Sequence, residues 1–251
     1  MNFWIEDGGV KLNTRLEMPE NKNGSVPLVI LIHGLTGHMN EPHLIALKDA
    51  LLSEGFGVLR AEMYGHGNSG GKFADHNLYR WIDNTLAVID YARNIKGVSD
   101  LYLAGHSQGG LTVMMAAAMK RETIKGLIAL SPACMIPENA RNGKLLGVPF
   151  DRDLVPDKIQ LDEDHVLFGN YIRVARNIYV EQIAPEYRGP VLIVQGEADD
   201  TVPVQVAEDA AKLYENSDLV IIPGDTHCYD SHCDQMVSAV VGWLKKQRDN
   251  A

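Results

Sequence analysis

Cysteine is scarce in this chain, and it has no long apolar run and no long run of basic residues. Three cysteines in 251 residues are an odd number, which argues against a disulfide framework and predicts a reducing compartment, the cytoplasm. No stretch reaches the roughly 18 apolar residues of a membrane span, so we expect no membrane partner. The opening MNFWIEDGGV has neither a basic n-region nor an apolar h-region, so we expect no secretory leader.

The charge balance is acidic, with 33 Asp and Glu against 23 Lys and Arg and a net charge of -10. Such a chain would repel a phosphate backbone, so we expect no nucleic-acid partner. The hydrophobic content of 45% is enough for one sizeable core, which predicts a single domain over residues 1–251. The sequence leaves a homodimer open.

Short apolar runs alternate with segments of helical period, which predicts an α/β fold with a mostly parallel central sheet flanked by helices. A turn-forming Asp-Gly-Gly predicts an antiparallel hairpin at one edge, over residues 3–18. Runs rich in Val, Ile and Leu predict strands buried on both faces over 26–33, 56–63, 100–106, 124–131, 190–196 and 217–224. The expected helices are 41–54, 77–94, 108–121, 205–215 and 233–248.

One connection, from Ser131 to Pro190, is far longer than the dozen or more residues of a plain crossover. We therefore expect an insertion after the sixth strand, over about residues 134–185, that forms a cap.

The stretch LYLAGHSQGG carries Gly-x-Ser-x-Gly between a predicted strand and a predicted helix. This is the pattern of a nucleophile elbow, in which small residues flank a serine on a very sharp turn. We therefore predict that Ser107 is the nucleophile.

A serine hydroxyl needs a base, and the base needs a carboxylate that orients it. In this type of fold the partners follow in the order serine, acid, histidine. The loop GEADDTVP offers Glu197, Asp199 and Asp200, and we predict Asp199 from its spacing to the flanking Gly and Val-Pro, with Asp200 as the alternative. His227, after the last predicted strand, is the expected base.

The oxyanion of acyl transfer needs two backbone N–H donors. We expect them at Gln108, directly after the nucleophile, and at Leu35, in the loop after the strand 26–33. His33 begins that loop at a strand end, where we expect a structural role.

The stretch GDTHCYDSHC also raises the question of a metal site. At helical spacing only Cys228 and His232 would share a face, which is too few ligands for structural zinc. We therefore expect no metal ligands here, and local packing roles for Cys228, His232 and Cys233.

The chain resembles the α/β-hydrolase superfamily through HGLTGH, MYGHGNSGGKF, AGHSQGG, GEADDTVP and GDTHCYD, in that order and spacing. SPACMIPENAR and FGNYIRVA in the insertion extend the resemblance, over nearly the whole chain, to the bacterial cinnamoyl (feruloyl) esterases. The resemblance implies an α/β-hydrolase fold, a serine carboxylic ester hydrolase without a cofactor, and a cap that receives a phenolic acyl group.

The resemblance also implies residues that bind the substrate. Tyr171 falls where relatives place a tyrosine that reaches the ring hydroxyls, although packing within the cap is the alternative. Glu138 and Asn139 occupy the early position of the insertion, where some relatives carry an aspartate.

The leading hypothesis is therefore a serine esterase that cleaves small feruloyl, caffeoyl or p-coumaroyl esters. A broad short-chain carboxylesterase or monoacylglycerol lipase would use the same triad. A C–C bond hydrolase and a catalytically silent binding module are further alternatives.

Overall fold

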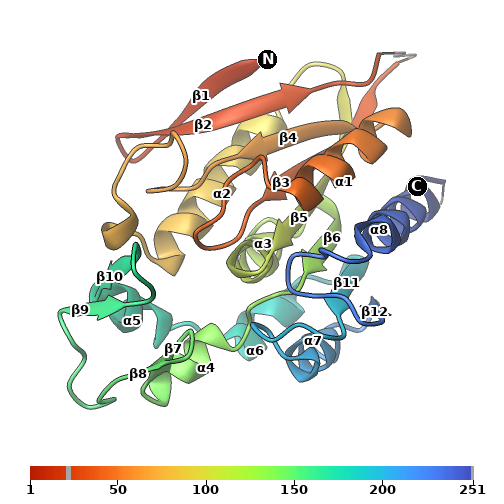
Figure 1. Cartoon of the computed structure of the whole chain (residues 1–251). Helices are drawn as coiled ribbons and strands as arrows, with labels where there is room; N and C mark the ends of the chain where they lie inside the picture. The colour runs from red at the N-terminus through yellow and green to blue at the C-terminus, as the bar shows by residue number, and fades with distance from the viewer. Residues whose placement is uncertain (21–23, 250–251) are drawn as a thin grey trace.

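The computed structural model describes residues 1–20 and 24–249 and has an eight-stranded central sheet (Figure 1). The strand order is β1-β2-β4-β3-β5-β6-β11-β12. The pairs β1–β2 and β2–β4 are antiparallel, and all the other pairs are parallel. This is the mostly parallel α/β sheet that the sequence predicts.

The first two strands form the expected hairpin at one edge of the sheet. Strand β1 (Asn2–Asp7) pairs with β2 (Val10–Glu17) around Gly8 and Gly9, whose φ values are 53° and 80°. Two positive φ values are what a tight hairpin turn demands, and glycine adopts them without steric cost. The remaining strands of the sheet are β3 (Val26–Ile32), β4 (Gly57–Ala61), β5 (Val98–His106), β6 (Ile124–Leu130), β11 (Val191–Gly196) and β12 (Ser217–Ile222).

Helices cover both faces of the sheet and create two cores. On β3, Leu28, Ile30 and Ile32 point into the core shared with α2, α3 and α7. Val29 and Leu31 point into the other core, with α1 and α8. This alternation is the period of two of a strand that is buried on both faces. The helices are α1 (Pro42–Ser53), α2 (Leu78–Ala92), α3 (Gln108–Met119), α7 (Val204–Ala211) and α8 (Cys233–Asp249), and a 3-10 turn, η1, covers Phe73–Asp75.

Two elements differ from the prediction in their burial or by more than two residues at one end. Strand β12 is only partly buried, because it is the edge strand and pairs with β11 alone. Helix α7 ends at Ala211, four residues before the predicted end, because the Leu213 and Tyr214 amides bond the carbonyls three residues back. Such bonds tighten the last turn and stop the α-helical ladder.

The chain between β6 and β11 forms small elements that lie where the arrows of β5 and β6 point (Figure 1). None of these elements was predicted individually, because strands of two or three residues carry no periodic signal. They are α4 (Ile136–Arg141), β7 (Lys144–Leu145), β8 (Val148–Pro149), β9 (Lys158–Gln160), β10 (Val166–Phe168), α5 (Asn170–Ala175), α6 (Val180–Ile183) and the 3-10 turn η2 (Ala184–Glu186). In the described part of the chain, no helix has the length and apolarity needed to cross a membrane.

Candidate active site

Ser107 lies on a strained turn between β5 and α3. Its φ of 57° and ψ of -119° are unusual for a residue with a side chain, and such a conformation costs about 1–3 kcal/mol. A Cβ at Gly105 would fall 2.3 Å from the carbonyl oxygen of Gly109, and one at Gly109 would fall 2.3 Å from that of His33. Only glycine fits at both positions, which explains the two flanking glycines of the motif.

The loops after β11 and β12 bring Asp199 and His227 together. Nδ1 of His227 lies 2.7 Å from Oδ2 of Asp199, so the ring N–H donates to the carboxylate. The other oxygen, Oδ1, accepts from the backbone N–H groups of Thr201 and Val202, at 2.9 and 2.8 Å. Oδ2 also accepts from the side-chain amide of Gln195 at 2.8 Å. Burial works to raise the pKa of Asp199, but these hydrogen bonds outweigh it and hold the pKa below its usual value.

Gln195 was not predicted as a site residue. It is fully buried in β11, and its Nε2 also donates to the carbonyl of Val202 at 2.9 Å. An amide inside a run of Val, Ile and Leu was the available signal, because a buried polar side chain needs hydrogen-bond partners.

The His227 loop is fixed next to the Ser107 turn through its backbone. Nε2 of His106, the residue before Ser107, lies 2.9 Å from the carbonyl oxygen of His227. Two residues further on, the hydroxyl of Tyr229 donates to the carbonyl of Val194 at 2.9 Å. Among the described residues, the Ser107 hydroxyl has no hydrogen bond to the His227 ring; such catalytic bonds often tighten only when substrate binds.

The predicted oxyanion donors lie on two neighbouring segments. Gln108 is the first residue of α3, where a backbone N–H has no partner within the helix. A Cβ at Gly34 would fall 3.1 Å from Cβ of Ser107, so the loop that carries Leu35 passes close to Ser107. Within residues 1–20 and 24–249, neither amide has a hydrogen-bond acceptor in the chain, so both can serve an oxyanion.

His33 holds this loop in place, as expected. Its Nδ1–H donates to the Gly34 carbonyl at 2.7 Å, and its Nε2 accepts from the Met63 N–H at 3.0 Å. Burial lowers its pKa to about 3, so the ring stays neutral.

The two alternative acids lie elsewhere in the loop. Asp200 is exposed and bonds the Thr201 hydroxyl, and Glu197 accepts from the backbone N–H of Gly224. In the part of the chain that the structure describes, only Asp199 bonds the His227 ring.

The three predicted substrate contacts do not converge on one cavity. Tyr171 is fully buried, and its hydroxyl donates to Oε1 of Gln108 at 2.6 Å. Burial raises the pKa of this phenol far above its usual value. Glu138 and Asn139 lie on α4 and border different hollows.

Two cavities flank the predicted site. One of about 380 Å³ lies between the predicted oxyanion loop at Thr36–His38, residues 65–73 and the turn at Asp164 and His165. The other, of about 590 Å³, lies between the insertion at Asn139 and the acid loop at Asp200. Both are in the size range of small-molecule sites.

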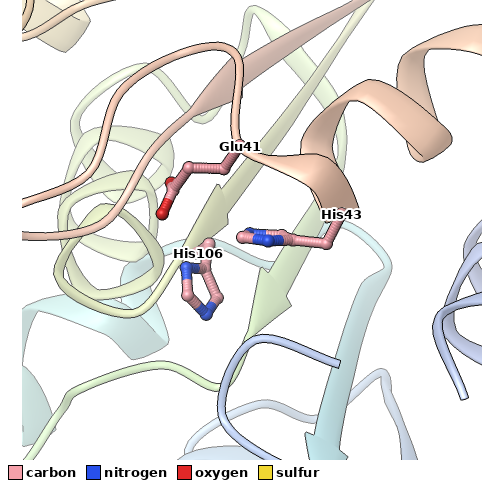
Figure 2. Close-up of side chains that lie close together, drawn as sticks. All are labelled: Glu41, His43 and His106. Carbon is pink, nitrogen blue, oxygen red and sulfur yellow. The ribbon is translucent and has the colours of Figure 1, made fainter. Parts of the chain in front are cut away.

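The cysteines and His232 do not gather into a metal site with His227. Among the described residues, one other group brings three ligand-type atoms within 4.8 Å of one another: Glu41, His43 and His106 (Figure 2). We assign no metal to this group.

Known proteins resemble this chain over nearly its whole length. A family model described as "Serine aminopeptidase, S33" matches residues 25–165, and a second, described as "TAP-like protein", matches residues 173–249. The chain belongs to the α/β-hydrolase esterase family. The solved structure "Ferulic Acid bound to Est1E from Butyrivibrio proteoclasticus" is 50% identical, covers 98% of this chain and 99% of that one, and has a TM-score of 0.97.

Curated relatives are more distant. Human Protein ABHD12B is 25% identical over 88% of this chain and 61% of its own length. Human mitochondrial palmitoyl-protein thioesterase ABHD10 is 22% identical over 79% of this chain and 65% of its own length. The chain therefore spans less than two thirds of these curated relatives.

Proposed function

We propose that this protein is a serine carboxylic ester hydrolase that cleaves hydroxycinnamate esters through an acyl-enzyme. The observation that carries the proposal is the bonded His227–Asp199 pair, whose main chain is held beside the strained Ser107 turn. The likeness to Est1E, with ferulic acid bound, supports the hydroxycinnamate substrate.

In the proposed acylation step, Ser107 attacks the ester carbonyl and its proton passes to Nε2 of His227. The Nδ1–H bond to Asp199 keeps His227 in the tautomer whose Nε2 has a free lone pair. The Leu35 and Gln108 N–H groups stabilise the oxyanion. The alcohol leaves with the proton from His227.

Water then attacks the acyl-enzyme in the second step. His227 takes a proton from that water and returns it to Ser107, which releases the free hydroxycinnamic acid. Each step needs only groups of the chain and water, so we propose no cofactor.

The insertion is the proposed cap over the acyl group. Its bond from Tyr171 to Gln108 supports this, because it ties the insertion to the residue after the nucleophile. The three free cysteines support a reducing compartment such as the cytoplasm.

A short-chain carboxylesterase or lipase is the second candidate. The curated relative named as a palmitoyl-protein thioesterase favours it, since that name refers to an aliphatic acyl group. The same triad would then act on an ester whose acyl group is an alkyl chain, and the insertion would hold that chain in place of the phenol.

The test compares kcat/KM for methyl ferulate and p-nitrophenyl butyrate, with Ser107→Ala as the blank. We expect ferulate to be hydrolysed at least as efficiently as butyrate. Hydrolysis of butyrate alone would select the second candidate, and activity that survives in Ser107→Ala would refute the triad.

A further inference from the structure

Three buried polar side-chain atoms face one another behind the Ser107 turn. They are Oε2 of Glu41, Nε2 of His43 and Nδ1 of His106, and each of these residues has a ligand-type atom within 4.8 Å of one from each of the other two (Figure 2). Within the described residues, none of the three has a hydrogen-bond partner. Buried polar atoms are normally satisfied, so the cluster needs a group that bridges it.

Glu41 lies between two parts of the proposed catalytic machinery. It directly precedes α1, and a Cβ at Gly37 would fall 2.6 Å from its Oε2, so the carboxyl packs against the oxyanion loop. On its other side is His106, which continues β5 directly into Ser107. Sequence reasoning missed Glu41, because neither a motif nor a period marks it.

The tautomer of His106 follows from its second nitrogen. Nε2 faces the His227 carbonyl at 2.9 Å, and a carbonyl only accepts, so Nε2 carries the hydrogen. Burial, with nearby histidines, lowers the pKa of His106 well below its usual value, so the ring is neutral. Nδ1 is therefore a lone pair that needs a donor.

We propose that Glu41 is a positioning residue of this esterase, whose carboxylic acid form donates to Nδ1 of His106 directly or through one water molecule. The bond fixes the tautomer whose Nε2–H holds the main chain of His227. Ligand-type atoms of Glu41 and His106 lie within 4.8 Å of each other, a separation that one water molecule can bridge. The inference rests on the proposed function, because the held histidine is the proposed base.

The surroundings of Glu41 support a proton at neutral pH. Burial raises the pKa of Glu41 to about 7, while charge on His227 and the nearby backbone of His38 and Gly34 oppose the rise. Burial lowers the pKa of His43, on α1, to about 4, so that ring is neutral as well.

The remaining charged groups come from the His227 loop. Cys228 and Asp230 interact with Glu41 and His43 respectively, and burial raises the pKa of the Cys228 thiol to about 11, so it is uncharged at neutral pH. The exposed Asp230 carries the nearby negative charge.

The direction of the pH effect follows from these groups. Below a pH of about 7, Glu41 is protonated and donates to His106. Above that pH, its carboxylate faces another acceptor and the bond is lost. The turnover number should therefore decline as the pH rises through about 7.

The experiment measures kcat for p-nitrophenyl butyrate between pH about 5.5 and about 9 in the wild type, Glu41→Gln and Glu41→Ala. The amide of Glu41→Gln donates at every pH, so we expect it to keep kcat within about threefold and to lose the alkaline decline. Glu41→Ala should lose about tenfold below a pH of about 7, because a buried acceptor loses its donor, and the difference from wild type should shrink above that pH, where the wild-type bond is lost as well. Asp230→Asn, the matched control, should keep the wild-type profile.

Two results would overturn the inference: an alkaline decline that persists unchanged in Glu41→Gln, or a metal that copurifies stoichiometrically and is lost in that variant. If Glu41→Ala fails to fold, the profile of Glu41→Gln decides alone. Ser107→Ala in the same assay separates the two proposals. If Ser107→Ala is inactive and Glu41→Gln keeps the wild-type pH profile, only the inference about Glu41 is rejected. If Ser107→Ala is active, the proposed esterase mechanism is rejected.

Discussion

Replacement of Asp199 by asparagine tests the triad, because the surrounding donors dictate how the new side chain must lie. Oδ1 accepts from the Thr201 and Val202 N–H groups, so the asparagine oxygen must stay on that side. The new NH₂ group then takes the place of Oδ2 and faces Nδ1 of His227. To accept from it, His227 must move its proton to Nε2, where it can no longer take the proton of Ser107.

The magnitude follows from this wrong tautomer. The equivalent change in a serine protease triad lowers kcat about 10⁴-fold, or roughly 5 kcal/mol of transition-state stabilisation. We expect a similar loss for Asp199→Asn. Stability should also fall, because the Nε2 group of Gln195 then faces another donor. Gln195 cannot flip to relieve this, since Nε2 also donates to the Val202 carbonyl. The cost should be about 1–3 kcal/mol, at about 2–4 °C of Tm per kcal/mol.

The stability loss should depend on pH with a definite sign. The pKa of Asp199 lies below its ordinary value of 3.8 in the folded state, so its carboxylate stabilises the fold above that pH. This contribution disappears as the pH falls through the lowered pKa. The Tm difference between wild type and Asp199→Asn should therefore be full at pH 7 and shrink in acid.

Kinetics on p-nitrophenyl butyrate and thermal melts measure both effects. Asp200→Asn is the matched control, since Asp200 is exposed and one residue away, and it should keep kcat within about twofold. An equal or larger loss in Asp200→Asn, or less than a tenfold loss in Asp199→Asn, would refute the assignment.

Three further changes address the rest of the site. Tyr171→Phe should lower kcat/KM for methyl ferulate and methyl cinnamate alike if the hydroxyl positions Gln108, and for ferulate alone if it binds the phenol. Gly109→Ala should lower the free energy of unfolding, measured by chemical denaturation, by about 3 kcal/mol, because its Cβ would lie 2.3 Å from a backbone carbonyl oxygen. Gly242→Ala is the control: a Cβ there has nothing within 4 Å, so it should not destabilise α8. His232→Ala should keep most of the turnover. The metal hypothesis would gain support if His232→Ala lost as much turnover as His227→Ala and if added zinc restored the activity of chelator-treated wild type.

The parts of the site that sequence could predict are those set by strand ends. Ser107, Asp199 and His227 each follow a predicted buried strand, and the carboxyl ends of parallel strands meet at one edge of the sheet. The bond between Asp199 and His227 confirms that these two loops meet. The oxyanion roles of Leu35 and Gln108 stay predictions, because no bound oxyanion marks them.

The parts that sequence could not predict depend on contacts between distant residues. His106 reaches the His227 carbonyl across 121 positions, and Tyr171 reaches Gln108 across 63. A pattern records that each side chain is polar or aromatic, but its partner is decided only when the insertion and the loops pack. The roles of Tyr171, Glu138 and Asn139 in substrate binding remain predictions for the same reason.

The geometry separates the chemistry of this protein from its substrate choice. The Ser107 turn is held by its own neighbours: its N–H bonds the Leu130 carbonyl at 2.8 Å, and its carbonyl accepts from Leu111 and Ala133 at 3.1 and 3.0 Å. These bonds offset the strain at φ 57° with no contribution from residues 134–185. The insertion contributes the Tyr171 bond and one wall of each cavity. Changes in the insertion should therefore alter which ester enters while Ser107, Asp199 and His227 keep their positions. The comparison of ferulate with butyrate hydrolysis thus tests the role of the insertion, and Ser107→Ala tests the role of the turn.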